Sequence, residues 1–74
     1  MSTILVIDDE PQMRRLLRVV LESEGYKVFE APSGRDGLVE TASRLPDVVI
    51  LDLGLPDLPG GDVLRRLREQ GPDL

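Results

Sequence analysis

The sequence predicts an α/β fold, with a parallel three-stranded sheet in the order 2-1-3. Three short runs rich in apolar and β-branched residues, 4–7, 26–31 and 48–51, have the composition of strands. Each run is followed by a segment with helical spacing of its apolar residues. Strands that alternate with helices of this length need right-handed crossovers, and these crossovers produce a parallel sheet.

The first strand and helix are the clearest elements. Residues 4–7 form a continuous apolar run, which is typical of a strand covered on both faces. A helix is expected from Pro11 to Ser23, because proline is tolerated in a first turn and Gly25 supplies the left-handed residue that ends many helices. Its predicted inward stripe is Met13, Leu16, Leu17, Val20 and Leu21.

The second strand, residues 26–31, is expected at an edge because Lys27 and Glu30 interrupt it. Residues 33–36 then resemble a helix-capping sequence, with Asp36 in place of the usual Glu or Gln, and Pro46 ends the predicted helix. The predicted inner face of this helix is Leu38, Val39, Ala42 and Leu45.

The third strand, residues 48–51, is wholly apolar, a composition that favours a central position. Residues 54–61 are rich in Gly and Pro and are expected to form a loop directly after Asp52. A last helix is predicted with Asp62 as its cap and its end at residues 71–72. Its inward residues are expected to be Val63, Leu64 and Leu67.

Acidic residues stand where two of these strands end. Asp8 and Asp9 follow the first strand, and Asp52 follows the third. In the order 2-1-3 the first strand is central, so these two strands are neighbours whose carboxyl ends border the crevice where such sheets bind ligands. We therefore expect the three carboxylates to meet in space.

Three carboxylates held together repel one another unless a cation compensates them. Mg²⁺ is the expected cofactor, since it prefers oxygen ligands and is often bound by one or two carboxylates and a phosphate oxygen. Beside such an ion, an aspartate can attack a phosphoryl group and form an aspartyl phosphate. Asp52 is the candidate nucleophile because it stands alone. Taken singly, each Asp is more often a turn or cap residue, and only the joint arrangement favours the metal–phosphoryl interpretation.

The composition limits other functions. The chain has 74 residues, no cysteine and a net charge of −5, so we expect one small domain that does not bind nucleic acid directly. Two basic groups are expected to be solvated helix faces: Arg14, Arg15 and Arg18, and Arg65, Arg66 and Arg68. With no membrane-length apolar run and no signal-type start, a cytoplasmic location is expected.

Several motifs together resemble the response-regulator receiver domains of two-component signalling, which have a flavodoxin-like (CheY-like) parallel sheet. They are residues 4–11 (ILVIDDEP), residues 48–53 (VVILDL), and Leu55-Pro56 with Gly60 eight positions after Asp52. The sequence of residues 51–57 (LDLGLPD) is similar to that of the KdpE-type winged-helix transcription regulators of the OmpR/PhoB class.

This resemblance implies roles for particular residues. Asp52 would be the phosphoacceptor, Asp9 a direct Mg²⁺ ligand with Asp8 assisting through water, and the backbone carbonyl of Gly54 a further ligand. The phosphodonor would be a phosphohistidine on a sensor histidine kinase, and the parent protein would control transcription. Receiver domains catalyse their own phosphorylation and slow dephosphorylation, so the chain is not expected to be an enzyme in the usual sense.

The sequence departs from the family in length. Family members carry two more βα units, which place a Ser or Thr and a Lys beside the phosphoryl group, whereas the only lysine here is Lys27. Residues 1–74 are therefore expected to be a truncated receiver domain with three βα units. We expect it either to self-associate through the free edge of the third strand or to be a fragment of a longer protein.

Two alternatives remain open. An inert structural or interaction fragment would fold but could not be phosphorylated. A Mg²⁺-dependent phosphohydrolase would need a second acid two residues after the nucleophile, where this chain has Gly54.

Overall fold

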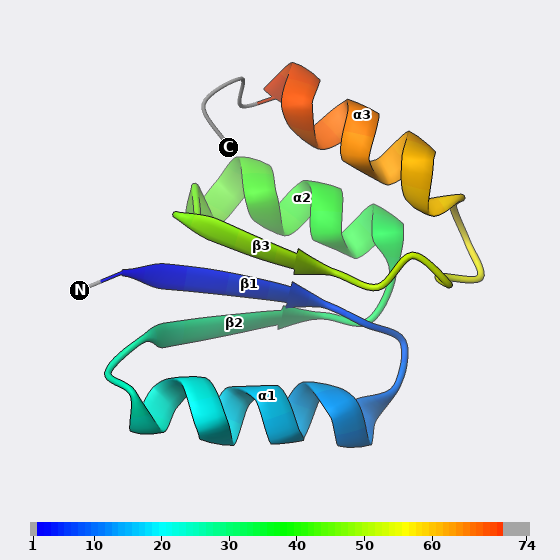
Figure 1. Ribbon diagram of the computed structural model, residues 1–74. Coiled ribbons are helices and arrows are strands. Elements are labelled where there is room, and N and C mark those ends of the chain that lie inside the picture. The colour runs from blue at the N-terminus through cyan, green and yellow to red at the C-terminus, as the bar shows by residue number, and fades with distance from the viewer. Residues whose placement is uncertain (1, 71–74) are drawn as a thin grey trace.

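The computed structural model describes residues 2–70 and has the predicted α/β architecture. The elements follow in the order β1 (Thr3–Ile7), α1 (Pro11–Ser23), β2 (Lys27–Ala31), α2 (Gly34–Arg44), β3 (Val48–Leu51) and α3 (Gly60–Gln70). The sheet order is β2-β1-β3 and both strand pairs are parallel, so the predicted order is confirmed. Helix α1 covers one face of the sheet, and α2 and α3 cover the other (Figure 1).

Strand β1 is buried on both faces, as its unbroken apolar run predicts. Leu5 and Ile7 belong to the larger core beneath α2 and α3, whereas Ile4 and Val6 belong to the smaller core beneath α1. This alternation follows from the two-residue period of a strand. Because β1 is the best-packed strand, it is a rigid support for the residues that follow it.

The ends of α1 and α2 also follow the sequence. Gly25 has a φ of 92°, and the N–H groups of Gly25 and Tyr26 donate to the carbonyls of Glu22 and Leu21, which closes α1 with a Schellman motif. At the start of α2, the Ser33 hydroxyl oxygen accepts a hydrogen bond of 3.1 Å from the Asp36 amide. The predicted capping sequence is confirmed.

The predicted inner face of α1 is only partly correct. Leu17 and Leu21 pack against the sheet, but Met13, Leu16 and Val20 are largely exposed, Leu16 at 56%. A sheet of three strands contacts only a narrow line along a helix, so the flanks of the helix's apolar stripe are buried only if another element lies beside the helix. Within residues 2–70, the face of the sheet that carries α1 has no second helix.

The predicted inner face of α2 was mostly wrong. Val39, Ala42 and Leu45 are exposed, and Leu45 has a left-handed φ of 49° at the end of the helix. The buried residues of α2 are Gly34, Gly37, Leu38 and Thr41, so Leu38 is the one member of the predicted face that is correct. These mostly small residues let α2 lie close to β1, and the buried Thr41 hydroxyl donates to the Gly37 carbonyl at 2.7 Å.

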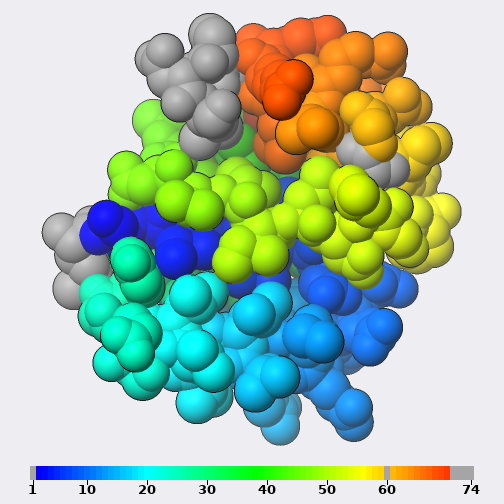
Figure 2. Space-filling view, in the orientation of Figure 1, coloured from blue at the N-terminus to red at the C-terminus, as the bar shows by residue number. Residues whose placement is uncertain are grey.

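Strand β3 lies at the sheet edge within the described residues, as the predicted order 2-1-3 requires, although its apolar composition alone favoured a central position. Val48 is half exposed, and Figure 2 shows β3 (yellow-green) at the surface between α1 (cyan) and α3 (orange). A groove of about 340 Å³ separates β3 from α3. Its lining residues are Asp47, Val48, Val49, Leu51, Leu64, Leu67 and Arg68.

Helix α3 begins at Gly60 and not at Asp62, which lies inside the first turn. Val63 and Leu67 are buried as predicted, whereas Leu64 is partly exposed in the groove beside β3. The predicted helix end at residues 71–72 lies outside the described residues. Across residues 2–70, none of the helices combines the length and the apolar character needed to cross a membrane.

Candidate functional site

The parallel ladder brings the acidic residues to one end of the sheet. Ile7 of β1 is in register with Leu51 of β3, so Asp8 and Asp52 follow equivalent positions. Beyond the paired residues, the Asp52 amide donates to the Ile7 carbonyl at 2.9 Å, and the Asp8 amide donates to the Ala31 carbonyl at 3.1 Å. These bonds hold both chain segments at the point where they leave the sheet.

The carboxylates of Asp8, Asp9 and Asp52 converge there, as predicted. One oxygen from each lies within 4.8 Å of the other two, with Asp8 and Asp52 half-buried and Asp9 exposed. Among residues 2–70, no arginine or lysine forms an ion pair with any of these three carboxylates. Three carboxylate oxygens at this spacing, without an ion pair to a side chain among these residues, suit a small divalent ion that prefers hard ligands.

Two of these aspartates also form local turns. Oδ1 of Asp8 accepts from the Glu10 amide, and Oδ1 of Asp52 accepts from the Gly54 amide, both at 2.9 Å. Such turns hold one carboxylate oxygen in place. The turn role and the metal role are therefore compatible, because each carboxylate has a second oxygen. The Gly54 amide bond places Gly54 beside Asp52, while its carbonyl as a metal ligand stays a prediction.

Asp57 anchors the loop after Asp52, a role that its sequence context does not predict. Its carboxylate accepts from the backbone amides of Gly34 and Arg35, both at 2.9 Å, at the start of α2. The donors lie more than twenty positions earlier in the chain, so no local pattern reveals the contact. The buried loop residues Leu55 and Leu58 fix the same loop to the core.

This anchor should make the stability of the fold sensitive to acid. The amide hydrogen bonds from Arg35 and then Gly34 hold the pKa of Asp57 below its ordinary value of 3.8. Because the folded-state pKa is the lower one, the stabilisation is present above pH 3.8 and is lost as the pH falls through the folded-state value. We expect Asp57→Asn to melt below the wild type near neutral pH, and the difference to shrink in acid.

Thermal melts followed by circular dichroism across this range measure the effect. Asp36→Asn is the control, since the exposed Asp36 contributes its backbone amide, not its carboxylate, to the α2 cap. A gap between Asp57→Asn and the wild type that stays constant at all pH values would contradict the assignment.

Two basic residues of α1 are less solvated than predicted. Arg14 and Arg18 pair with Glu30 of β2 and do not form a purely solvated face. The other four, Arg15, Arg65, Arg66 and Arg68, are exposed as predicted. Lys27 is in register with Thr3, at the opposite end of the sheet from the acids. Lys27 therefore does not reach the acidic site.

Comparison with known proteins agrees with this geometry. The family model of the response regulator receiver domain matches residues 4–74. The transcriptional regulatory protein KdpE of Mycobacterium tuberculosis is 56% identical over 68 residues, which are 92% of this chain and 30% of that protein. The KDP operon regulatory protein KdpE of Escherichia coli is 49% identical over 69 residues, 93% of this chain and 31% of the relative. The chain thus spans about a third of these relatives.

A similar solved structure is the response regulator TrrA of Thermotoga maritima. In its complex with Mg²⁺-BeF it has a TM-score of 0.94 and 40% identity, and the alignment covers 99% of this chain and 64% of that one. TrrA has also been solved in complex with the histidine kinase ThkA, with a TM-score of 0.92. The fold therefore has a counterpart that has been solved with Mg²⁺-BeF and with a histidine kinase.

Proposed function

The chain belongs to the family of response regulator receiver domains, and on this basis we propose that Asp52 accepts a phosphoryl group from a sensor histidine kinase. The observation that carries the proposal is the convergence of the Asp8, Asp9 and Asp52 carboxylates at the carboxyl ends of β1 and β3. Residues 1–74 would then be the first three βα units of a receiver domain.

The acidic cluster fits Mg²⁺, because its donors are all hard oxygens. Asp9 and Asp52 would be direct ligands of the ion, and Asp8 would assist through water. The Gly54 carbonyl would be the remaining ligand that the protein supplies. When bound, the ion neutralises charge that develops on the phosphoryl oxygens. Asp52 supplies the nucleophilic oxygen, and its hydrogen bond from the Gly54 amide orients the carboxylate.

The phosphodonor would be a phosphohistidine. An Asp52 carboxylate oxygen forms the new bond to phosphorus while the phosphorus–nitrogen bond breaks, and the imidazole leaves with that electron pair. The TrrA–ThkA complex supports a kinase partner, and the names of the relatives support control of transcription by the parent protein. The module is an acceptor and switch, not an enzyme that releases a product from a bound substrate.

Phosphorylation can be tested without the kinase. Incubation of the chain with acetyl phosphate and Mg²⁺, followed by intact mass measurement, should detect one labile phosphoryl group. No adduct in a folded chain would favour the inert-fragment alternative, in which the Ser/Thr and Lys of the remaining βα units are required for the reaction.

Mg²⁺ should also stabilise the fold, because it relieves repulsion among carboxylates that come together only in the folded state. A ligand at about 100 times its dissociation constant adds roughly 2.7 kcal/mol to the free energy of unfolding. We expect the melting temperature to rise with Mg²⁺, and Asp9→Ala to remove the rise. Asp36→Ala, at an exposed acid outside the cluster, should keep it. An equal melting temperature with and without Mg²⁺ in the wild type would contradict the metal site.

We further propose that the β3 edge is an association surface for another strand, here a second copy of the chain. Its outer side has no strand partner within residues 2–70, and an apolar groove lies beside it. Light scattering at increasing concentration should show a rising mean mass, and Val49→Lys should lower it by placing a charge in the groove. A stable monomer at all concentrations would rule this out.

A further inference from the structure

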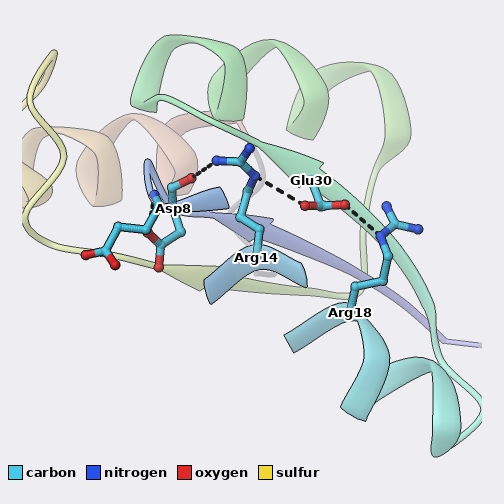
Figure 3. A network of polar contacts seen from close by, with 5 residues as sticks. Asp8, Arg14, Arg18 and Glu30 are labelled. Atoms are coloured by element: carbon cyan, nitrogen blue, oxygen red, sulfur yellow. Dashed lines mark hydrogen bonds and ion pairs between the residues drawn. The ribbon is translucent and has the colours of Figure 1, made fainter. Parts of the chain in front are cut away.

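A polar network connects α1, β2 and the segment that carries the acidic site (Figure 3). Arg14 of α1 donates through Nη1 to the backbone carbonyl of Asp8 at 2.7 Å, and through Nε to Glu30 of β2 at 3.2 Å. The other Glu30 oxygen accepts from Nε of Arg18 at 2.6 Å. The Arg14 side chain is only 16% exposed, so solvent screens its contacts less than those of a surface pair.

The contact with Asp8 bears directly on the site. The Asp8 carbonyl and the Asp9 amide belong to one rigid peptide plane, and this plane sets the direction in which the Asp9 side chain leaves the backbone. The Asp8 amide on the other side is held by the Ala31 carbonyl at 3.1 Å, and Oδ1 of Asp8 is held by the Glu10 amide. Arg14 thus holds the Asp8 carbonyl, which accepts no backbone hydrogen bond within residues 2–70.

We propose that Arg14 is a positioning residue that orients Asp8 and Asp9 for the divalent ion. The inference rests on the proposed metal site. Arginine suits the task because its planar guanidinium can donate to the carbonyl and to a carboxylate at the same time. Glu30 fixes the guanidinium and offsets its charge, which would otherwise oppose a cation bound nearby.

Charge and position have opposite effects on ion binding, so they can be separated. Arg14→Gln removes a positive charge from a chain of net charge −5, which by electrostatics alone should strengthen cation binding. If Arg14 positions the ligands, the same substitution should weaken binding, by roughly tenfold as for other groups that support metal ligands. Mn²⁺ is a suitable probe because it takes the same oxygen ligands. Its unbound fraction is measured by electron paramagnetic resonance below the melting temperature.

Two matched variants serve as controls. Arg18→Gln breaks the other half of the Glu30 network but leaves the Asp8 carbonyl contact, and Arg15→Gln removes an exposed charge from the same helix. Both should bind Mn²⁺ at least as tightly as the wild type. Weakening by Arg15→Gln equal to that by Arg14→Gln would overturn the inference, because loss of a charge without the Asp8 contact would then have the same effect.

Arg14→Lys covers the case in which Arg14→Gln does not fold. It keeps the charge, but its single ammonium group lacks the planar fork, so an intermediate loss of Mn²⁺ affinity is expected. Wild-type affinity in Arg14→Lys and in any folded Arg14→Gln would overturn the positioning role alone. A wild-type chain that binds no Mn²⁺ would instead overturn the metal site, and the inference with it.

Discussion

Asp52→Asn is expected to abolish phosphoryl transfer to the chain while leaving the fold intact. The amide that replaces the carboxylate has no nucleophilic oxygen anion, so the bond to phosphorus cannot form. Its oxygen can still accept the hydrogen bond that Asp52 receives from the Gly54 amide. Intact mass after incubation with acetyl phosphate and Mg²⁺ should therefore show no adduct, and circular dichroism should match that of the wild type.

Two further variants sharpen this result. Asp9→Asn keeps the nucleophile but weakens the cation site, so the adduct should form more slowly. Asp36→Asn removes an exposed acid outside the cluster and should be labelled at the wild-type rate. Undiminished labelling of Asp52→Asn would show that another residue is the acceptor and would contradict the proposed function.

The acidic site could be predicted because it depends on topology alone. Apolar runs locate β1 and β3, and a parallel sheet with these strands adjacent brings their carboxyl ends together whatever the side chains between them. Asp8 and Asp52 are the residues that directly follow β1 and β3, so their meeting requires nothing beyond this strand order. The end of α1 was predictable for a similar reason, since Gly25 adopts its left-handed φ within a local motif.

The supporting contacts could not be predicted because they join polar groups that are far apart in the sequence. Glu30 was interpreted as a charge that prevents a further strand from pairing with the second strand. In the structure it binds two arginines of α1. Asp57 read as part of a Gly- and Pro-rich loop, yet it caps α2. Polar residues of this kind have no periodicity, and a partner on another element leaves no local signal.

The predictions of the buried helix faces were wrong for a different reason. Hydrophobic spacing identifies the side chains that prefer burial, but it does not reveal how closely a helix can approach the sheet. In α2 the approach is set by Gly37, where a side chain would overlap the buried Ile7. Glycine has no apolar side chain and therefore adds nothing to a hydrophobic stripe. Val39 and Ala42 were assigned to the core for this reason, and Gly37 was not.

The close approach at Gly37 leads to the largest expected change in stability. A Cβ atom at this position would overlap Cδ1 and Cγ1 of Ile7 and press against Cγ2, and Ile7 is itself fully buried under α2. Gly37→Val should force Ile7 out of its rotamer or lift α2 from β1. Overpacking of this kind costs roughly 1–3 kcal/mol, and we expect the upper end because valine adds two methyl groups beyond Cβ. At about 4–8 °C per kcal/mol for a domain of this size, thermal melts should show a large fall in melting temperature.

Gly61→Val in α3 provides the matched control, because a Cβ atom there has no neighbour within 4 Å. It makes the same substitution in a helix without the overlap, so its melting temperature should stay close to that of the wild type. Ile7→Val tests the cause directly. Shortening Ile7 costs about 0.5–1.5 kcal/mol alone, but in the Gly37→Val background it should recover stability, since the shorter side chain makes room. Strictly additive effects of the two substitutions would show that contact with Ile7 is not what requires glycine at position 37.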